Sequence, residues 1–363
     1  MKPRLLIIEL HHLGDAVLSL PFVRGAQADY QVHVLCRPAT RAVYELMAAP
    51  PIIHVWEPPW TGRPECSALA ALSAARTQGL ALRTRDFQIA VCAWADARAG
   101  LIMTETGAGQ RIGFPMTRGN YYAADHPWRK QRRLLGRALE QAWGWWPTNR
   151  PMLTRNLHRA QADQSHLGCW EQIAGVLDLA ADFSVPWFPS PDAAADVLGF
   201  VREAHDRGQQ VLAIHPHARL PGKQWPHAQW CTLLAAPWVR ERFALLEVLP
   251  PDTSTLGLEQ ALSISTPTIS SLAATLAAAD ALLGHDSMPA HLAAALGKPV
   301  VTIFGSGEPD WFAPWQNRHR AVIRRRCPLH PCIDQCGMDR YLCVENVSID
   351  DVIAQLAGLP GLS

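Results

Sequence analysis

The 363-residue sequence has no uninterrupted run of about 18 apolar residues, the length that a membrane-spanning helix requires. The first apolar stretch, which follows Met1–Arg4, is too short for the hydrophobic segment of a secretory signal peptide. The sequence also has no excess of charge of either sign, because 33 Lys and Arg balance 32 Asp and Glu to a net charge of +1. We therefore expect a cytoplasmic protein without a nucleic-acid partner.

Charged residues make up only 18% of the chain and hydrophobic residues 48%, a composition typical of a folded protein. Nine cysteines in a chain of this length do not form the dense framework of a small secreted domain, so reduced thiols are expected. The length favours two domains. We place them at residues 1–185 and 193–345, joined by a proline-rich linker at 184–191 and followed by a C-terminal helix in 346–363.

Two common nucleotide-binding motifs are missing. There is no Gly-Lys-Ser/Thr loop of the Walker type. The glycines in 107–113 superficially resemble a dinucleotide fingerprint, but their spacing is one residue too long and they precede a strand instead of following one. Neither motif therefore supports a nucleotide site.

Apolar runs of strand length alternate with helical stretches in both halves of the chain. This alternation predicts an α/β fold with parallel sheets and right-handed crossovers. The expected strands are residues 4–10, 30–36, 52–56, 87–94 and 111–114 in the first half, and 210–215, 243–249, 281–283 and 300–304 in the second half.

The segment 284–305 is the most informative part of the sequence. An apolar run ends at Gly284, Asp286 and Ser287 follow, and a short helix then leads to Gly297 and a second apolar run. A helix N-terminus carries unpaired N–H groups and the positive end of the helix dipole, so this loop suits a phosphate or diphosphate. Asp286 and Ser287 are also good helix caps, and capping alone is the alternative explanation.

A similar arrangement follows the first strand, where Gly14 and Asp15 precede a helix expected from Ala16 to Arg24. A simple capping role is again the alternative for Asp15. Ligands of open α/β sheets bind beyond the carboxyl ends of the strands. If the two sheets face each other, Asp15 and Asp286 lie on opposite walls of one cleft.

Three further features carry charge or thiols. Lys223 lies in the loop after strand 210–215, where it can reach a phosphate. The basic run 128–137 is either a solvated helix face or a patch for a phosphorylated acceptor or an anionic membrane surface. Four cysteines occur within 17 residues, and they are either plain reduced thiols, candidate ligands of a structural zinc or iron site, or partners in a disulfide: Cys327, Cys332, Cys336 and Cys343.

Taken together, these segments resemble glycosyltransferase family 9, the ADP-heptose:lipopolysaccharide heptosyltransferases. The resemblance extends over nearly the whole chain and includes the late cysteine-rich loop. It lies in the motifs Leu13–Pro21, Asp96-Ala97-Arg98, Arg111–Phe114, Ile214-His215-Pro216, Lys223–Pro226, Asp286–Ala293 and Gly297–Val301. It implies a GT-B fold of two facing Rossmann-like domains and inverting transfer from a nucleotide sugar without a catalytic metal.

The resemblance also implies roles for individual residues. Asp15 would be the general base, and the donor would be bound by Lys223, Asp286, Ser287, Met288 and His291. The acceptor, a glycan or a lipid-linked molecule such as lipopolysaccharide core at the inner membrane surface, would contact His12 and the basic run through Arg129, Lys130, Arg132 and Arg133.

Two positions differ from the usual family pattern. Met288 stands where the family usually has Gly, and the acidic residue that holds the ribose has two candidates, Glu247 and Asp252. Two other functions therefore stay open: a sugar-nucleotide epimerase of similar fold, which needs no acceptor, and a non-catalytic relative that only binds sugar nucleotides.

Overall fold

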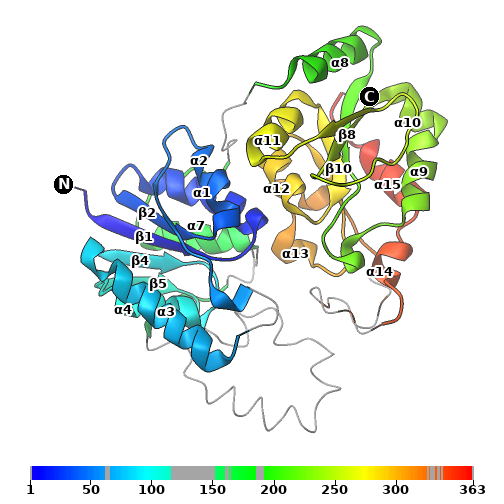
Figure 1. Cartoon of the computed structure of the whole chain (residues 1–363). Coiled ribbons are helices and arrows are strands. Elements are labelled where there is room, and N and C mark those ends of the chain that lie inside the picture. The colour runs from blue at the N-terminus through cyan, green and yellow to red at the C-terminus, as the bar shows by residue number, and fades with distance from the viewer. Residues whose placement is uncertain are drawn as a thin grey trace. The chain divides into compact units, whose positions relative to one another are not determined.

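The computed structural model describes residues 2–61, 66–115, 152–159, 163, 165–184, 192–324, 327, 332, 336 and 338–361. The chain divides into two compact units, residues 1–184 and 185–363. Each unit contains a six-stranded parallel sheet with helices on both faces, as Figure 1 shows. The predicted α/β class with parallel sheets is confirmed.

In unit 1 the strand order is β3-β2-β1-β4-β5-β6. The chain starts in the middle of the sheet, adds strands outward on one side, and returns beside β1 with β4, where Ile7 aligns with Val91. The carboxyl ends of β1 and β4 therefore form the topological switch point at which such sheets bind ligands. The strands are β1 (Arg4–Glu9), β2 (Gln31–Cys36), β3 (Ile52–Val55), β4 (Ile89–Cys92), β5 (Gln110–Gly113) and β6 (Arg155–Asn156).

Helices cover both faces of this sheet. Figure 1 shows α3 (Ala68–Leu82) and α4 (Ala97–Glu105) on one face, and α1 (Leu13–Ala26) and α2 (Arg41–Glu45) on the other. Successive strand residues point to opposite faces, so Leu6 and Ile8 join the core beneath α3 and α4. On the other face α1 packs against α7 (His166–Val176), with the rings of Phe22 and Trp170 5.0 Å apart.

Unit 2 repeats this winding, with the order β12-β11-β10-β7-β8-β9. Its first strand, β7, again lies in the middle beside the fourth strand, β10, so the switch point lies between the ends of these two strands. The strands are β7 (Gln210–His215), β8 (Phe243–Leu249), β9 (Leu262–Ser265), β10 (Ala281–His285), β11 (Val300–Ile303) and β12 (Ala321–Val322).

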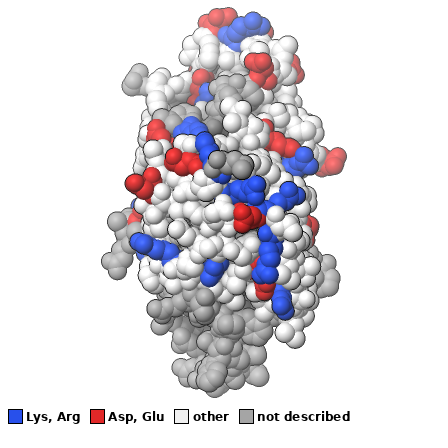
Figure 2. Space-filling view, turned by 90° about the vertical axis from the view of Figure 1, so that its left-hand side faces the viewer, with Lys and Arg blue, Asp and Glu red and all other residues white. Residues whose placement is uncertain are grey.

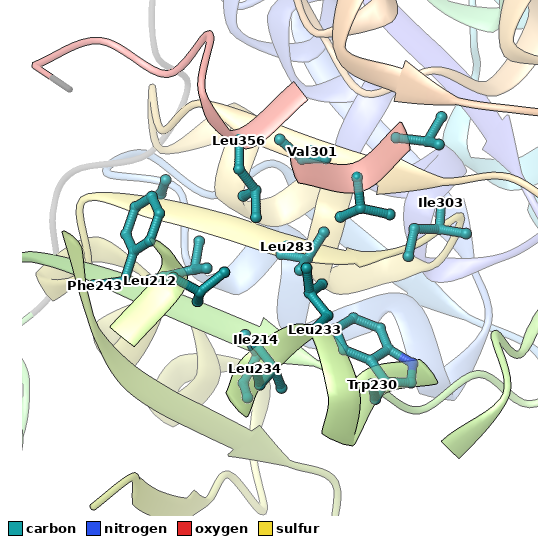
Figure 3. Close-up of a cluster of buried hydrophobic side chains, with 14 of the residues drawn as sticks. Leu212, Ile214, Trp230, Leu233, Leu234, Phe243, Leu283, Val301, Ile303 and Leu356 are labelled. Atoms are coloured by element: carbon teal, nitrogen blue, oxygen red, sulfur yellow. The ribbon is translucent and has the colours of Figure 1, made fainter. Parts of the chain in front are cut away.

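The core of unit 2 lies between the sheet and helices α9, α10 and α15. Figure 3 shows side chains from β7, β8, β10 and β11 meeting Trp230, Leu233 and Leu234 of α9 and Leu356 of α15. In Figure 1, α11 and α12 lie on the opposite face. The helices are α8 (Ala195–Asp206), α9 (His227–Ala235), α10 (Pro237–Arg242), α11 (Ile269–Ala278), α12 (Met288–Ala295), α13 (Pro309–Phe312), α14 (Leu342–Glu345) and α15 (Ile349–Leu356).

Two predicted boundaries are wrong at places that matter for the site. Helix α1 begins at Leu13, not at Ala16, because His12 takes the N-cap position and Asp15 falls in the first turn. Strand β10 continues through Gly284 and His285, because both pair with β11 and no side chain is needed for the ladder. Thr268 and Ser348 cap helices α11 and α15, since each side chain accepts an N–H bond from the third residue of its helix.

No helix in the described part of the chain is both long and apolar enough to cross a bilayer. On the face shown in Figure 2, Lys and Arg lie among Asp and Glu. This mixture agrees with the balanced formal charge of the sequence.

Candidate functional site

Asp15 lies in the first turn of α1, directly after β1. Its Oδ2 accepts a hydrogen bond of 2.9 Å from the backbone N–H of His12, and the residue is only 7% exposed. The carboxylate thus satisfies one of the N–H groups that a helix N-terminus leaves unpaired. The structure shows the helix-end contact of the capping alternative, while a second carboxylate oxygen stays available for chemistry. His12, the N-cap residue, is exposed beside it.

A cluster of ionisable and aromatic side chains that the sequence did not predict lies next to Asp15. Glu9, the last residue of β1, is fully buried, and its Oε1 accepts a 3.1 Å bond from the N–H of His11. Its Oε2 lies 3.6 Å from Nε2 of the buried His166, the first residue of α7. The ring of His11 stacks on Trp94 at 4.3 Å, and the ring of Trp94 lies 4.6 Å from that of His166.

Asp96 follows β4 at the same end of the sheet. Its carboxylate caps α4 through the N–H of Arg98 and also binds the guanidinium of Arg98, with an Nη2–Oδ2 distance of 2.6 Å. Burial alone would raise the pKa of Asp96, but the bonds from Arg98 outweigh burial and lower it. The Asp96-Ala97-Arg98 motif therefore forms a local ion pair beside the Glu9 cluster.

In unit 2 the structure brings Lys223 and Asp286 together. Lys223 lies in the loop after β7, Asp286 follows β10, and Nζ of the lysine is 2.9 Å from Oδ2 of the carboxylate. Asp286 is 6% exposed and the lysine side chain is 20% exposed. A buried carboxylate is costly unless it is paired, so this contact explains why Asp286 can be buried.

The Lys223 loop is fixed to the strand by its neighbours. The N–H of Trp225 donates a 2.9 Å bond to Nε2 of His285, and Nε1 of Trp225 donates to the carbonyl of Val347. Burial lowers the pKa of His285 to about 3, so its ring stays neutral and can accept this bond. The lysine is thus held by the same strand that carries Asp286.

Two glycines allow a third loop to approach this pair. A Cβ on Gly307 would lie 2.5 Å from Oδ2 of Asp286. A Cβ on Gly305 would lie 2.1 Å from the carbonyl oxygen of Gly222. The absence of a side chain at these two positions lets the segment Gly305-Ser306-Gly307 approach Gly222 and Asp286 closely.

The start of α12 differs from the prediction in one respect. Ser287 occupies the N-cap position, but its hydroxyl donates to the carbonyl of His285 and makes no cap bond with α12. The side chain of Ser287 therefore does not cap α12. Pro289 has no N–H and Ala290 bonds back to Ser287, so an anion at this end could meet only the N–H groups of Ser287 and Met288. His291 is buried in the helix.

The two ribose candidates have different surroundings. Glu247 is fully buried in β8, and its two oxygens accept bonds of 2.7 Å from the N–H of Leu256 and the hydroxyl of Ser263. It therefore holds the loop that follows β8. Asp252 is exposed and has a left-handed backbone with φ of 58°.

The cysteine-rich segment contacts the Lys223 loop. Sγ of Cys343 lies 3.9 Å from the carbonyl oxygen of Gly222, and burial, followed by the nearby thiols of Cys327 and Cys336, raises the pKa of Cys343. Cys332 is also buried. Within the described residues, however, no three His, Cys, Asp or Glu side chains come together as metal ligands, so the quartet does not form the tetrahedral set that its spacing predicted. The basic run with Arg129, Lys130, Arg132 and Arg133 lies outside the described residues.

Comparison with known proteins bears directly on the loop of Asp286. Residues 258–342 match the model of glycosyltransferase family 9 (heptosyltransferase). This segment contains β10, α12 and the Gly305–Gly307 loop. This part of the chain is similar to glycosyltransferase family 9.

A curated relative supports this similarity. The chain is 31% identical over 121 residues to lipopolysaccharide heptosyltransferase 3 of Escherichia coli. The match covers 30% of this chain and 35% of that protein, so it spans about a third of the relative.

Solved structures of family 9 share the fold of the whole chain. The glycosyltransferase family 9 protein of Veillonella parvula is 14% identical, covers 99% of this chain and 98% of its own, and has a TM-score of 0.63. The ADP-heptose lipopolysaccharide heptosyltransferase II of E. coli is 17% identical over 99% and 98% of the two chains, with a TM-score of 0.60. At sequence identities this low, the structural matches show the fold alone, and it is the predicted GT-B fold.

Proposed function

We propose that this protein is an inverting glycosyltransferase that moves a heptose from ADP-heptose to lipopolysaccharide core or a related glycan. The observation that carries the proposal is the Lys223–Asp286 pair, 2.9 Å apart at the switch point of unit 2. Asp286 lies within the match to family 9 at residues 258–342. The similar fold of an ADP-heptose lipopolysaccharide heptosyltransferase supports the choice of donor.

The donor is assigned to unit 2. A diphosphate would attract Nζ of Lys223 and the N–H groups of Ser287 and Met288, all of which lie at the strand ends around β7 and β10. These groups stabilise the negative charge that grows on the diphosphate as the bond to the sugar breaks. Asp286 holds Lys223 by its ammonium group before the donor arrives, so the lysine is already oriented.

The proton is assigned to Asp15 in unit 1. The acceptor hydroxyl forms a bond to the anomeric carbon, the bond between that carbon and the diphosphate oxygen breaks, and ADP departs with the electron pair. The hydroxyl proton passes to Asp15, whose Oδ1 is not used in the bond to His12. Attack opposite to the departing oxygen inverts the anomeric centre.

An assay with ADP-heptose distinguishes this proposal from its alternatives. The protein is incubated with the donor alone and with lipopolysaccharide core acceptors, and products are followed by mass spectrometry and NMR. Transfer that requires the acceptor supports the glycosyltransferase. Isomerised donor without acceptor would indicate an epimerase, and donor binding without any product would indicate a non-catalytic relative.

A structural role for a metal is a separate proposal. The four thiols near Lys223 are of the type that zinc and iron prefer, although their described positions do not form a ligand set. If the loop binds a metal, Cys343 would brace the Gly222–Lys223 turn that it contacts. Elemental analysis of protein purified without added metal is expected to give about one zinc or iron per chain, and metal-free protein of full stability would contradict it.

A further inference from the structure

The carboxyl end of β1 carries three acidic groups around one histidine ring. Glu9 approaches His11 twice, through the backbone N–H bond of 3.1 Å and through a distance of 3.6 Å between Oε1 and Nδ1 of the ring. Asp15 and Asp96 are near enough for their charges to act on the same ring. The His11 side chain is 27% exposed and rests on Trp94.

The charges around this ring favour its protonated form. Burial would lower the pKa of His11, but the bond and charge of Glu9, followed by the charges of Asp15 and Asp96, raise it above its usual value. Burial would likewise raise the pKa of Glu9, but the rings of His11 and His166, each 3.6 Å from a carboxylate oxygen, outweigh burial and lower it to about 2. A carboxylate and an imidazolium thus stabilise each other below the surface.

The acidic groups differ in how they are compensated. The carboxylate of Asp96 pairs with the guanidinium of Arg98, and the carboxylate of Glu9 lies 3.6 Å from the rings of His11 and His166. In the described part of the chain, no Lys or Arg forms an ion pair with Asp15, and its hydrogen bond comes from a neutral backbone N–H. The other charged group that contacts this loop is Arg37, whose guanidinium donates to the carbonyl of His11 at 3.3 Å.

We propose that Glu9 and His11 are positioning residues for Asp15. The buried Glu9 carboxylate lies 3.6 Å from Nδ1 of the His11 ring, and a positive charge on this ring offsets the repulsion among the three neighbouring carboxylates and keeps the loop that carries Asp15 in place. Glu9 also fixes the loop itself, since Glu9 and Asp15 bind the N–H groups of the consecutive residues His11 and His12. This inference rests on the proposed role of Asp15 as the base.

The first test needs no substrate, because electrostatic coupling between two groups is reciprocal. The titration of the His11 ring is followed by NMR in the full-length protein, with its signal assigned by its absence in His11→Gln. The midpoint is expected to fall by about one pH unit in Glu9→Gln and by a smaller, measurable amount in Asp15→Asn. His205→Gln, which removes an exposed histidine of unit 2, is the control and leaves the midpoint unchanged.

The second test is the pH dependence of kcat/KM. In His11→Gln the acid limb is expected to move to higher pH by the same amount as the His11 midpoint falls in Asp15→Asn, while the plateau at high pH stays within a few-fold of the unaltered protein. A purely structural effect of the substitution would lower the rate at every pH. In Glu9→Gln the acid limb should lie between that of the unaltered protein and that of His11→Gln.

The outcomes separate this inference from the proposed function. An unchanged His11 midpoint in Asp15→Asn overturns the positioning role, whatever the activity is. An unchanged acid limb in His11→Gln overturns it while leaving Asp15 as the base. Full activity of Asp15→Asn would show that Asp15 is not the base, and the inference would then fail together with the proposed mechanism.

Discussion

Asp15 has an observed contact at the end of its helix and a proposed role as the base, and a single substitution can separate the two. In Asp15→Asn the amide oxygen can still accept the N–H bond of His12, but the side chain cannot take a proton. Turnover is expected to fall by roughly 10²–10⁴-fold, while donor affinity stays within a few-fold. Steady-state kinetics and calorimetric titration with ADP measure the two effects, and a melting curve checks the fold. Near-normal turnover in a folded variant would leave Asp15 with only its helix-end role.

Lys223 tests the location of the donor. Lys223→Ala removes the charge opposite Asp286 and is expected to weaken ADP binding by about 1.5–3 kcal/mol, the value of a charge-assisted hydrogen bond. The variant should also be less stable, because Asp286 is left buried without its ammonium partner. Lys2→Ala, which removes an exposed lysine of unit 1, is the charge-matched control. Unchanged ADP affinity in Lys223→Ala would show that the diphosphate binds elsewhere.

Single residues were predictable where the chain itself places them. Asp15, Lys223 and Asp286 each follow a buried strand, and the carboxyl ends of parallel strands meet at one edge of the sheet. The Glu9 cluster gave no such signal, because His166 begins a helix far along the chain and only the folded sheet brings it to Glu9. The ion pair of Lys223 with Asp286 is likewise a tertiary contact that spacing does not reveal.

At the scale of elements, the Gly305–Gly307 loop packs against Gly222 and Asp286, at the proposed donor site. Gly307→Ala puts a methyl group 2.5 Å from Oδ2 of Asp286, so the carboxylate must shift away from Lys223. We expect ADP affinity to fall by about tenfold, as for partial loss of a charge-assisted contact. Gly199→Ala in α8, where nothing lies within 4 Å of the added methyl group, is the control. If Gly307→Ala binds ADP normally, the loop does not determine the geometry of the pair.

The elements themselves were predictable to different degrees. Long apolar strands such as β1, β7 and β8 were found because each is buried along its length. Helices α7 and α8 were missed. Helix α7 contains Gly168 and Gly175, which lower helix propensity, and α8 starts after Ala194 without a side-chain cap. Tertiary packing, not the local sequence, specifies these two helices.

For the whole molecule, buried neutral histidines predict acid sensitivity. Burial lowers the pKa of His285 to about 3 and that of His215 to about 4. The unfolded chain therefore binds more protons than the native state below pH about 6.5, and stability falls as the pH falls from there toward the folded pKa values. At pH 4.5 the loss is on the order of 2 kcal/mol for each histidine.

Urea denaturation at pH 7.5 and pH 5 measures this dependence. The pH range also separates the histidines from Glu9, because a carboxylate with a folded pKa of about 2 loses its stabilising effect only below its unfolded value of about 4.5. His285→Gln keeps an acceptor for the N–H of Trp225 but cannot be protonated, so it should show a weaker pH dependence. If the stability of His285→Gln depends on pH as steeply as that of the unaltered protein, protonation of His285 does not cause the acid sensitivity.

The contacts of the last helix have a consequence for synthesis on the ribosome. Trp225 bonds to Val347, the side chain of Gln210 bonds to the carbonyl of Pro360, and Leu356 lies in the core of unit 2. Gln210, at the start of the first strand of unit 2, thus bonds to a residue that is synthesised 150 residues later. Unit 1, whose strands pair among themselves, can complete its sheet while unit 2 is still being translated. The folded surroundings of Asp15 should therefore form early, and those of Lys223 only when translation is nearly complete.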